Sequence, residues 1–223
     1  MSPPRSGAAA AAPRAARGGA ATPRLRRLRR AELPVDTEAL ARFLVGKVLV
    51  REDAQGCASG RIVEAEAYHQ DDPSAHTHRG ETARNRTMFG ERGHAYVYFI
   101  YGCWHALNVS AEVRGVGAGV LLRALVPLEG VALMQARRGN VRLTDLARGP
   151  GRLASALAID RALDGTDLCA PGPLWLAADG AYPRVGVTTR IGLSREAHRH
   201  LRFYSREPAD LPYVSGPRHA LRM

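Results

Sequence analysis

Short β-forming runs separated by turn residues fill the stretch from Gly60 to Arg123. Runs of β-branched, aromatic or alternating residues predict strands, and the polar and glycine-containing segments between them predict turns. Consecutive strands joined by short turns pair antiparallel. The sequence is therefore expected to form an α+β fold, with a curved, mostly antiparallel sheet surrounded by helices and a protruding β-hairpin that turns at Tyr101-Gly102.

The remaining pattern places further elements on both sides of this stretch. Asp36 or Thr37 is expected to cap the first helix. Helices are expected at 39–44, 128–138 and 153–159, and strands at 45–51, 58–68, 95–100, 107–111, 120–125, 173–176, 184–188 and 200–204.

The first 30 residues differ from the rest of the chain. They contain eight arginines and no acidic residue, and so carry most of the formal net charge of +11. With few large apolar side chains, this segment cannot bury enough surface to offset the entropy of ordering. Residues 1–30 are expected to be a disordered basic tail and residues 31–223 a single domain. Composition leaves open whether the tail contacts phosphates, is a transit peptide or is a solvated extension.

Composition also argues against several classes of protein. No stretch approaches the roughly 18 apolar residues of a membrane span, and no signal peptide is evident, so an intracellular location in a bacterial cytoplasm is expected. The three cysteines are too widely spaced for a C-x-x-C motif. Lys47 is the only lysine and lies in an apolar, strand-like run, which makes it a poor candidate for Schiff-base chemistry.

Two carboxylates occupy one face of the strand expected at 58–68. Because side chains alternate along a strand, Ile62, Glu64, Glu66 and Tyr68 would share a face that looks onto open space, with the small residues between them turned to the core. Repulsion between two such acids raises the pKa of one, which suits a general acid or base. The same spacing occurs on ordinary solvated strands, and strand geometry does not separate Glu64 from Glu66.

Aromatic residues favour the functional interpretation. Tyr96 and Tyr98 would share a face of a neighbouring strand, and rings beside acids form a pocket for a flat, electron-poor ligand. Tyr101, at the hairpin tip, either folds back on the sheet or projects as a wedge of the kind that opens DNA base steps. His76 and His78 have no third ligand at a diagnostic spacing, so a histidine in a pocket wall is favoured over a metal site.

Two glycine-rich segments bear on phosphate binding. Gly115–Gly119 lies between two expected strands, so it is interpreted as a hairpin turn and not as a nucleotide-binding loop. Arg148–Arg152 precedes an expected helix. Its free N–H groups and two arginines could hold a phosphate, although a simple helix start is the commoner meaning.

A series of different motifs follows a recognisable order along the chain. They lie at 60–68, 75–76, 84–89, 96–102, 108–109 and 120–130, with weaker ones at 149–153, 184–187 and 201–204. In order and spacing they resemble the alkyladenine (3-methyladenine) DNA glycosylase family of base-excision repair enzymes. The resemblance extends over roughly residues 35–216. Several motifs in order are far more specific than any single one.

The resemblance implies a monofunctional glycosylase and roles for individual residues. Glu66 would activate the water that attacks C1′ of a flipped nucleotide, releasing an alkylated or deaminated purine and leaving an abasic site. Tyr68, His76 and Tyr98 would bind the extruded base. Asn108 would exclude normal guanine by crowding its 2-amino group.

The resemblance also implies how DNA would be held. Tyr101 would fill the gap left in the duplex, and Arg123 would bind backbone phosphate near the flipped nucleotide. Double-stranded DNA with damaged purines is the expected partner, with no cofactor, no metal and a monomeric enzyme. The alternatives kept open are a noncatalytic nucleic-acid-binding module that uses the basic tail and the aromatic residues, and a hydrolase that acts on a small nucleoside.

Overall fold

The computed structural model describes residues 25–216. Residues 1–24, most of the predicted basic tail, lie outside the described residues, as do residues 217–223. The last part of that tail belongs to the fold: Arg26–Arg27 form strand β1, which pairs with β7 (Leu174–Ala178), and Leu28 is buried in the core. The folded domain therefore begins before residue 31, because β1 belongs to the sheet and Leu28 packs in the core.

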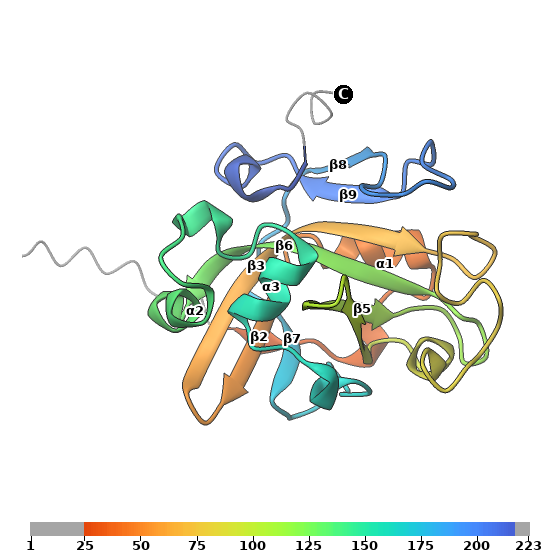
Figure 1. Cartoon of the computed structure of the whole chain (residues 1–223), viewed down its shortest axis with the longest axis horizontal. Helices are drawn as coiled ribbons and strands as arrows, with labels where there is room; N and C mark the ends of the chain where they lie inside the picture. The colour runs from red at the N-terminus through yellow and green to blue at the C-terminus, as the bar shows by residue number, and fades with distance from the viewer. Residues whose placement is uncertain (1–24, 217–223) are drawn as a thin grey trace, which may run out of the picture.

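Within residues 25–216, nine strands form one antiparallel sheet in the order β1-β7-β2-β3-β6-β5-β4, with β9 and then β8 added beside β3 (Figure 1). The other strands are β2 (Val48–Asp53), β3 (Gly56–Tyr68), β4 (Ala95–Ile100), β5 (Trp104–Ser110), β6 (Gly119–Glu129), β8 (Val185–Thr188) and β9 (Arg202–Ser205).

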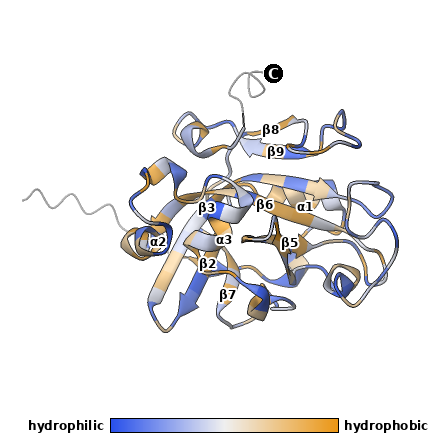
Figure 2. Cartoon of the chain, viewed as in Figure 1, coloured by the Kyte–Doolittle hydropathy of each residue, from blue (hydrophilic) through white to orange (hydrophobic). Residues whose placement is uncertain are grey.

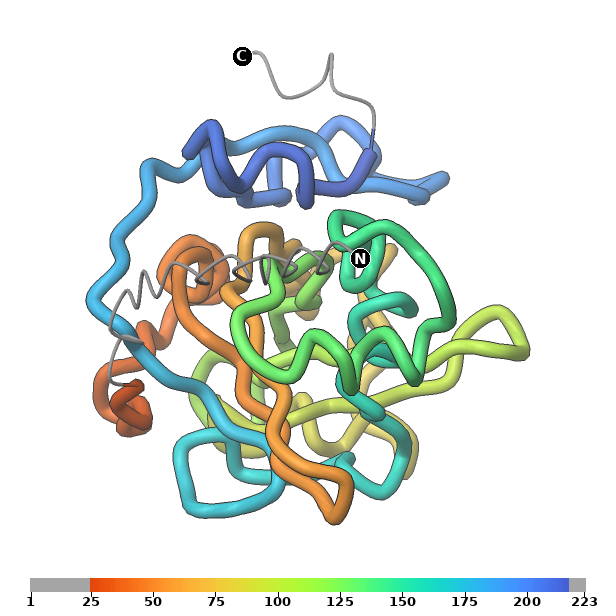
Figure 3. The backbone as a smooth tube through the Cα atoms, turned by 90° about the vertical axis from the view of Figure 1, so that its left-hand side faces the viewer, coloured from red at the N-terminus to blue at the C-terminus, as the bar shows by residue number. Residues whose placement is uncertain are grey.

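Strand β3 is the centre of this sheet. It is 13 residues long and pairs with β6 along one edge. On its other edge, β2 pairs with its first half and β9 with Glu64–Glu66. Figures 1 and 3 show the β8–β9 pair as a strip along one side of the molecule. Segments from both halves of the sequence therefore meet at the second half of β3.

Helices pack around the sheet, which confirms the predicted α+β class. They are α1 (Thr37–Leu44), α2 (Val131–Arg138) and α3 (Pro150–Ala156), with short 3-10 turns at Arg30–Glu32, Arg86–Phe89, Leu143–Asp145, Arg161–Leu163 and Leu211–Tyr213. The predicted cap of α1 is confirmed, because the Asp36 side chain accepts a hydrogen bond from Ala39 N. No helix between residues 25 and 216 is long and apolar enough to cross a membrane.

The main hydrophobic core joins the two ends of the sheet. Leu49 of β2, Ala65 of β3, Leu107 of β5 and Leu122 of β6 are fully buried and belong to one cluster with Leu153 of α3. Figure 2 shows the hydrophobic residues concentrated on the strands and helices and many hydrophilic residues in the peripheral loops. One main cluster that reaches strands on both sides of β3 makes one domain of residues 25–216.

Strands β3 and β6 each carry a bulge at the same level. Between Ile62 and Glu64 the register skips a residue of β3, and between Glu64 and Ala65 it skips a residue of β6. Ile62 consequently packs in the main core with Ala65, whereas Val63 packs in a separate cluster. The prediction that Ile62 shares a face with Glu64 is wrong, because a bulge interrupts the two-residue alternation.

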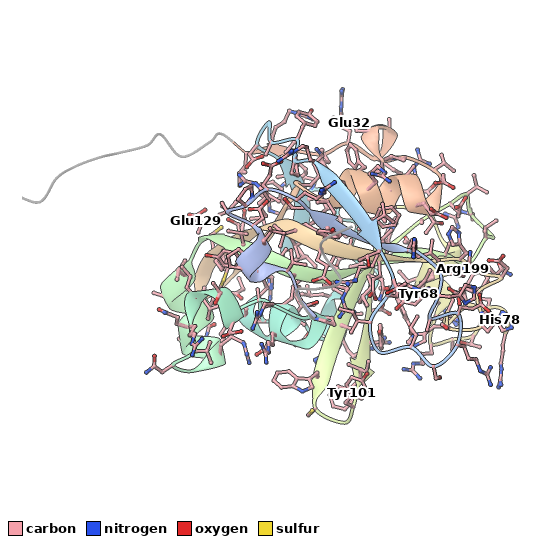
Figure 4. The ribbon with its side chains drawn as sticks, turned by 90° about the horizontal axis from the view of Figure 1, so that it is seen from above. Glu32, Tyr68, His78, Tyr101, Glu129 and Arg199 are labelled. Atoms are coloured by element: carbon pink, nitrogen blue, oxygen red, sulfur yellow. The ribbon has the colours of Figure 1, made fainter. Side chains whose placement is uncertain are left out.

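The predicted hairpin at Tyr101-Gly102 is confirmed. β4 and β5 pair from Ala95 with Val109 to Ile100 with Trp104. Tyr101 and Gly102 have φ angles of 54° and 69°, so both turn residues lie in the left-handed region. Figure 4 shows Tyr101 at the tip of this hairpin, at the edge of the molecule, and its side chain is 82% exposed.

We predict that Leu122→Ala lowers the free energy of unfolding by about 2–5 kcal/mol, because it leaves a cavity at a fully buried position of the main core. Urea denaturation followed by tryptophan fluorescence measures this loss. Leu143→Ala is the matched control, since Leu143 is 45% exposed. Equal losses at the two leucines would contradict the assignment of the core.

Candidate active site

Glu66 lies on β3 beneath the wall of a cavity and is fully buried. Its Oε1 accepts a hydrogen bond from the backbone N–H of Ile191 at 2.8 Å. Its Oε2 accepts from Tyr68 Oη at 3.0 Å and from Arg123 Nη1 at 3.0 Å. All three donor residues line the cavity, so Glu66 is held directly behind its surface.

Glu64, two residues earlier, is equally buried but faces other partners. Its Oε1 accepts from Arg123 Nε at 3.1 Å and from Arg202 Nη1 at 3.0 Å. Its Oε2 accepts from the backbone N–H and the hydroxyl of Ser215 at 2.7 and 2.6 Å. The expectation that both acids face open space is wrong, because both are fully buried and because Arg202 of β9 and Ser215 contact Glu64 directly.

The numbers of hydrogen bonds distinguish the two acids. A carboxylate offers about four acceptor positions on its two oxygens. Glu64 uses four and Glu66 uses three. Glu66 therefore keeps one acceptor position for a further donor, such as a water molecule, whereas Glu64 is saturated.

The environment of Glu66 raises its pKa. Burial is the largest cause, opposed by the positive charge of Arg123 and the hydrogen bond from Ile191. For Arg123, burial lowers the pKa, but the two carboxylates outweigh burial, so that the pKa is raised and the guanidinium stays charged. A carboxyl whose pKa is shifted upward is better suited to take a proton near neutral pH.

The cavity in front of Glu66 has a volume of about 550 Å³. Its wall is mostly apolar and aromatic, with contributions from β3, β4, β5, β6, the start of α3 and the loop after β8. The lining residues are Tyr68, Ser74, His76, Met88, Tyr96, Tyr98, Ile100, Tyr101, Trp104, Asn108, Leu121, Arg123, Gly149, Pro150, Gly151, Arg152, Ile191, Gly192 and Leu193. A cavity of this size and character fits a planar ligand of the dimensions of a nucleobase.

Three rings form one wall of the cavity. Tyr96 and Tyr98 stack with their centroids 5.4 Å apart, and His76 meets Tyr98 edge-on at 4.4 Å. His76 Nδ1 lies 3.1 Å from Tyr96 Oη. Burial lowers the pKa of His76 and raises that of Tyr98 to about 12, so both rings are neutral at physiological pH.

The predicted site residues come together from distant strands. Tyr96 and Tyr98 are on β4, which is separated from β3 by β5 and β6, so the prediction that they neighbour Tyr68 in the sheet is wrong. The curvature of the sheet nevertheless brings all three rings to one cavity. Asn108 lines the same cavity and is 5% exposed. Its Nδ2 has no hydrogen-bond partner among the described residues.

Arg123 has a different setting from the one expected of a phosphate ligand. It is 7% exposed, and its Nε and Nη1 donate to Glu64 and Glu66. Its third nitrogen, Nη2, makes only a weak contact, at 3.4 Å from Ser215 Oγ. Its position follows from the bulge, since the register skips Arg123 between Ala124 and Leu122 and turns its side chain toward both acids.

Several residues of the site gave no signal in the sequence. Ile191 acts through its backbone N–H, and Ser215 reaches Glu64 from 151 positions along the chain. The segment Arg148–Arg152, a candidate for phosphate binding, contributes its glycines and Arg152 to the lining of the cavity. Within residues 25–216 no group of three or more His, Cys, Asp or Glu side chains is arranged to hold a metal ion.

Comparisons with known proteins agree on one family. Residues 31–209 match the family model described as Methylpurine-DNA glycosylase (MPG). A protein of Mesorhizobium japonicum is 59% identical, with 85% of this chain and 90% of the relative aligned. A protein of Paraburkholderia phytofirmans is 53% identical over 87% of this chain and 90% of the relative. Both relatives carry the provisional name 3-methyladenine DNA glycosylase.

We predict that Glu64→Gln destabilises the protein far more than Glu66→Gln does. The first change removes the shared partner of two buried arginines, which costs about 3–5 kcal/mol. The second costs less, because Arg123 keeps its ion pair with Glu64 and because burial already penalises the ionised form of Glu66. Urea denaturation at pH 7.5 measures both, and equal losses would show that the two acids are equivalent.

Proposed function

The chain belongs to the methylpurine-DNA glycosylase family, and on that premise we propose that it excises 3-methyladenine and related alkylated or deaminated purines from double-stranded DNA, with Glu66 activating the attacking water. The enzyme class follows from the family, which hydrolyses N-glycosyl bonds. The observation that carries the proposal is the free acceptor position of Glu66 behind an aromatic cavity of the size of a base.

The first step is extrusion of the damaged nucleotide. A base inside a duplex cannot reach a cavity of this kind, so it has to rotate out of the stack at a cost of a few kcal/mol, and a damaged base costs least. Tyr68, His76 and Tyr98 would hold the extruded base. Stacking on tyrosine faces favours a positively charged alkylated purine. Because both His76 and Tyr98 are neutral, they add no repulsion toward such a cation.

Hydrolysis then breaks the bond between C1′ and N9 of the purine. For a cationic alkylated purine, the bonding electron pair leaves with the base and neutralises it, the water oxygen bonds to C1′, and the proton of the water passes to Glu66. Arg123 keeps Glu66 oriented and stabilises its ionised form before the proton arrives. The products are a free base and an abasic site.

Water is the proposed nucleophile because the chain offers no suitable amine. Its one lysine, Lys47, is buried between α1 and β2, with its Nζ 4.7 Å from the ring of Phe43 and 4.4 Å from that of Tyr182. Lys47 does not line the cavity. A Schiff base with C1′, and the strand cleavage that follows it, are therefore not part of the proposed reaction.

Asn108 gives the pocket a means to reject normal guanine. Its Nδ2 is a buried donor without a described partner, and guanine would bring its own 2-amino donor into the cavity. Two donors facing each other leave both unsatisfied, which costs about 1–3 kcal/mol per buried group. Adenine derivatives lack that amino group.

Tyr101 is the proposed wedge. It borders the cavity, and its ring stands free of the sheet. An exposed ring can occupy the space that the extruded nucleotide leaves. Backbone contacts would come from arginines at the cavity mouth, including Arg152 and the remaining Nη2 of Arg123. Action as a monomer and a DNA contact by the basic tail, residues 1–30, stay predictions.

We predict that Glu66→Gln lowers the single-turnover rate of base release by about 10²–10⁴-fold while duplex binding is kept, because the amide cannot accept the proton of water. The assay follows free 3-methyladenine released from methylated duplex DNA. Glu38→Gln, an exposed position on α1, is the control. Full release by Glu66→Gln with normal DNA binding would refute the assignment of the base. Binding without release by the wild type would favour the noncatalytic nucleic-acid-binding module.

We predict that Tyr101→Ala lowers the rate of release from duplex DNA by about 10–100-fold, since a stacked ring contributes about 1–3 kcal/mol per base. Release from single-stranded DNA should change much less, because no gap has to be filled there. Tyr182→Ala is matched as a control, since Tyr182 is 83% exposed and does not line the cavity. An equal loss on single and double strands would rule out the wedge.

A further inference from the structure

A buried ion pair lies behind the aromatic cavity wall. Arg190, after β8, places Nη1 2.5 Å from Oδ2 of Asp72, in the loop after β3. Both side chains are completely buried. The pair joins two loops that are far apart in sequence. Burying two charges is costly unless they hold each other and their surroundings in place, so the pair fixes the relation between these loops.

Each of the two loops contributes to the cavity. On one side, Asp72 Oδ1 accepts from the backbone N–H of Ser74, and Ser74 and His76 line the wall. On the other side, Arg190 directly precedes Ile191, which also lines the wall. A second bond, from Ser74 Oγ to the carbonyl of Arg195, joins the same two loops.

Arg190 also supports the strand that carries the acids. Its Nη1 donates to the carbonyl of Ala67 on β3 at 3.1 Å. Its guanidinium lies over the ring of Tyr68, 4.5 Å from the centroid. Arg190 itself does not line the cavity, whereas Tyr68 does. The arginine therefore lies behind Tyr68, away from the proposed base.

These contacts connect Arg190 to two of the three donors on Glu66. One donor is the hydroxyl of Tyr68, and the ring of Tyr68 packs against the Arg190 guanidinium. The other donor is the backbone N–H of Ile191. Both donors lower the pKa of Glu66, against the effect of burial. Arg190 contacts neither Glu66 nor the cavity, so it acts on Glu66 through Tyr68 and Ile191.

We propose that Arg190 and Asp72 are positioning residues that set the geometry and the protonation of Glu66 by fixing Tyr68 and Ile191. The inference rests on the proposed function of Glu66 as the base. The pair acts as one unit, since removal of either charge releases both loops. Arg199, whose Nη1 is 4.0 Å from Asp72 Oδ2, is too distant and too exposed to replace Arg190.

A pH profile separates positioning from a merely structural role. The charged and titratable groups around Glu66 are Arg123 on β6, Glu64 and Tyr68 on β3, Tyr98 on β4 and, through Glu64, Arg202 on β9. Arg190→Met leaves all of them in place. Without Arg190 the Tyr68 hydroxyl and the Ile191 N–H are no longer held against Glu66, so its pKa rises. Because Glu66 has to be ionised to accept a proton, the acidic limb of the rate profile moves to higher pH.

The test is single-turnover release of 3-methyladenine from methylated duplex DNA across pH 5–9 by the full chain. Arg190→Met and Asp72→Asn should each lower the rate by about 10–100-fold, as expected for a displaced catalytic group, and move the acidic limb upward. DNA affinity should be unchanged. Arg199→Met is the matched control and should behave as the wild type. An unmoved limb in Arg190→Met, whatever its rate, overturns the proposal.

Two further measurements, on a double variant and by NMR, test the positioning role without relying on the stability of the single variants or on the proposed function. The double variant Asp72→Asn with Arg190→Met leaves no unpaired buried charge, and it should show the same rate loss as either single variant if the pair is one unit. Additive losses overturn that claim. The amide resonance of Ile191 should titrate with Glu66 in the wild type and lose this response in Arg190→Met; an unaltered response overturns the positioning role. Should the wild type release no base, the proposed function fails, while this NMR measurement still decides the role of Arg190.

Discussion

The buried bridge from Glu64 through Arg123 to Glu66 is the interaction on which the site depends. One guanidinium donates to both acids, and neither acid is exposed to solvent. Charges at this depth are tolerated only with complete pairing and hydrogen bonding. Glu64 receives that complete set, and Glu66 receives one donor fewer. The imbalance turns two residues of the same type into a structural anchor and a candidate base.

The bulges in β3 and β6 make this bridge geometrically possible. Regular alternation would place Val63 and Glu64 on opposite faces, but the paired register shifts let Glu64, Glu66 and the skipped Arg123 meet on one side. The other face of the same strands keeps the packing of the main core through Ile62 and Ala65. The bulges in β3 and β6 thus let the same strands pack an apolar core on one face and hold charged side chains on the other.

Alternation and turn chemistry were sufficient to predict most strands, the hairpin at Tyr101 and the capping of α1 by Asp36, because those features depend on neighbouring residues. The bulge at Val63 was not predictable, since it arises from pairing with β6. Strand alternation does not distinguish Glu64 from Glu66, and only the family resemblance points to Glu66. Ser215, Arg190 and the N–H of Ile191 carry no local signature at all.

The contact between Ser215 and Glu64 has a consequence for how the protein matures. The two residues are separated by 151 positions, and β9, which supplies Arg202, is also distant from β3. Contacts of such long range form late, after the loop entropy between them has been overcome. While the first half of the sheet assembles, Glu64 has only the Arg123 donor and still lacks three of its four donors, which come from Arg202 and Ser215. The arrangement around the two acids is then completed only when β9 and the segment around Ser215 dock, so an incomplete chain would hold folded strands without a complete candidate site.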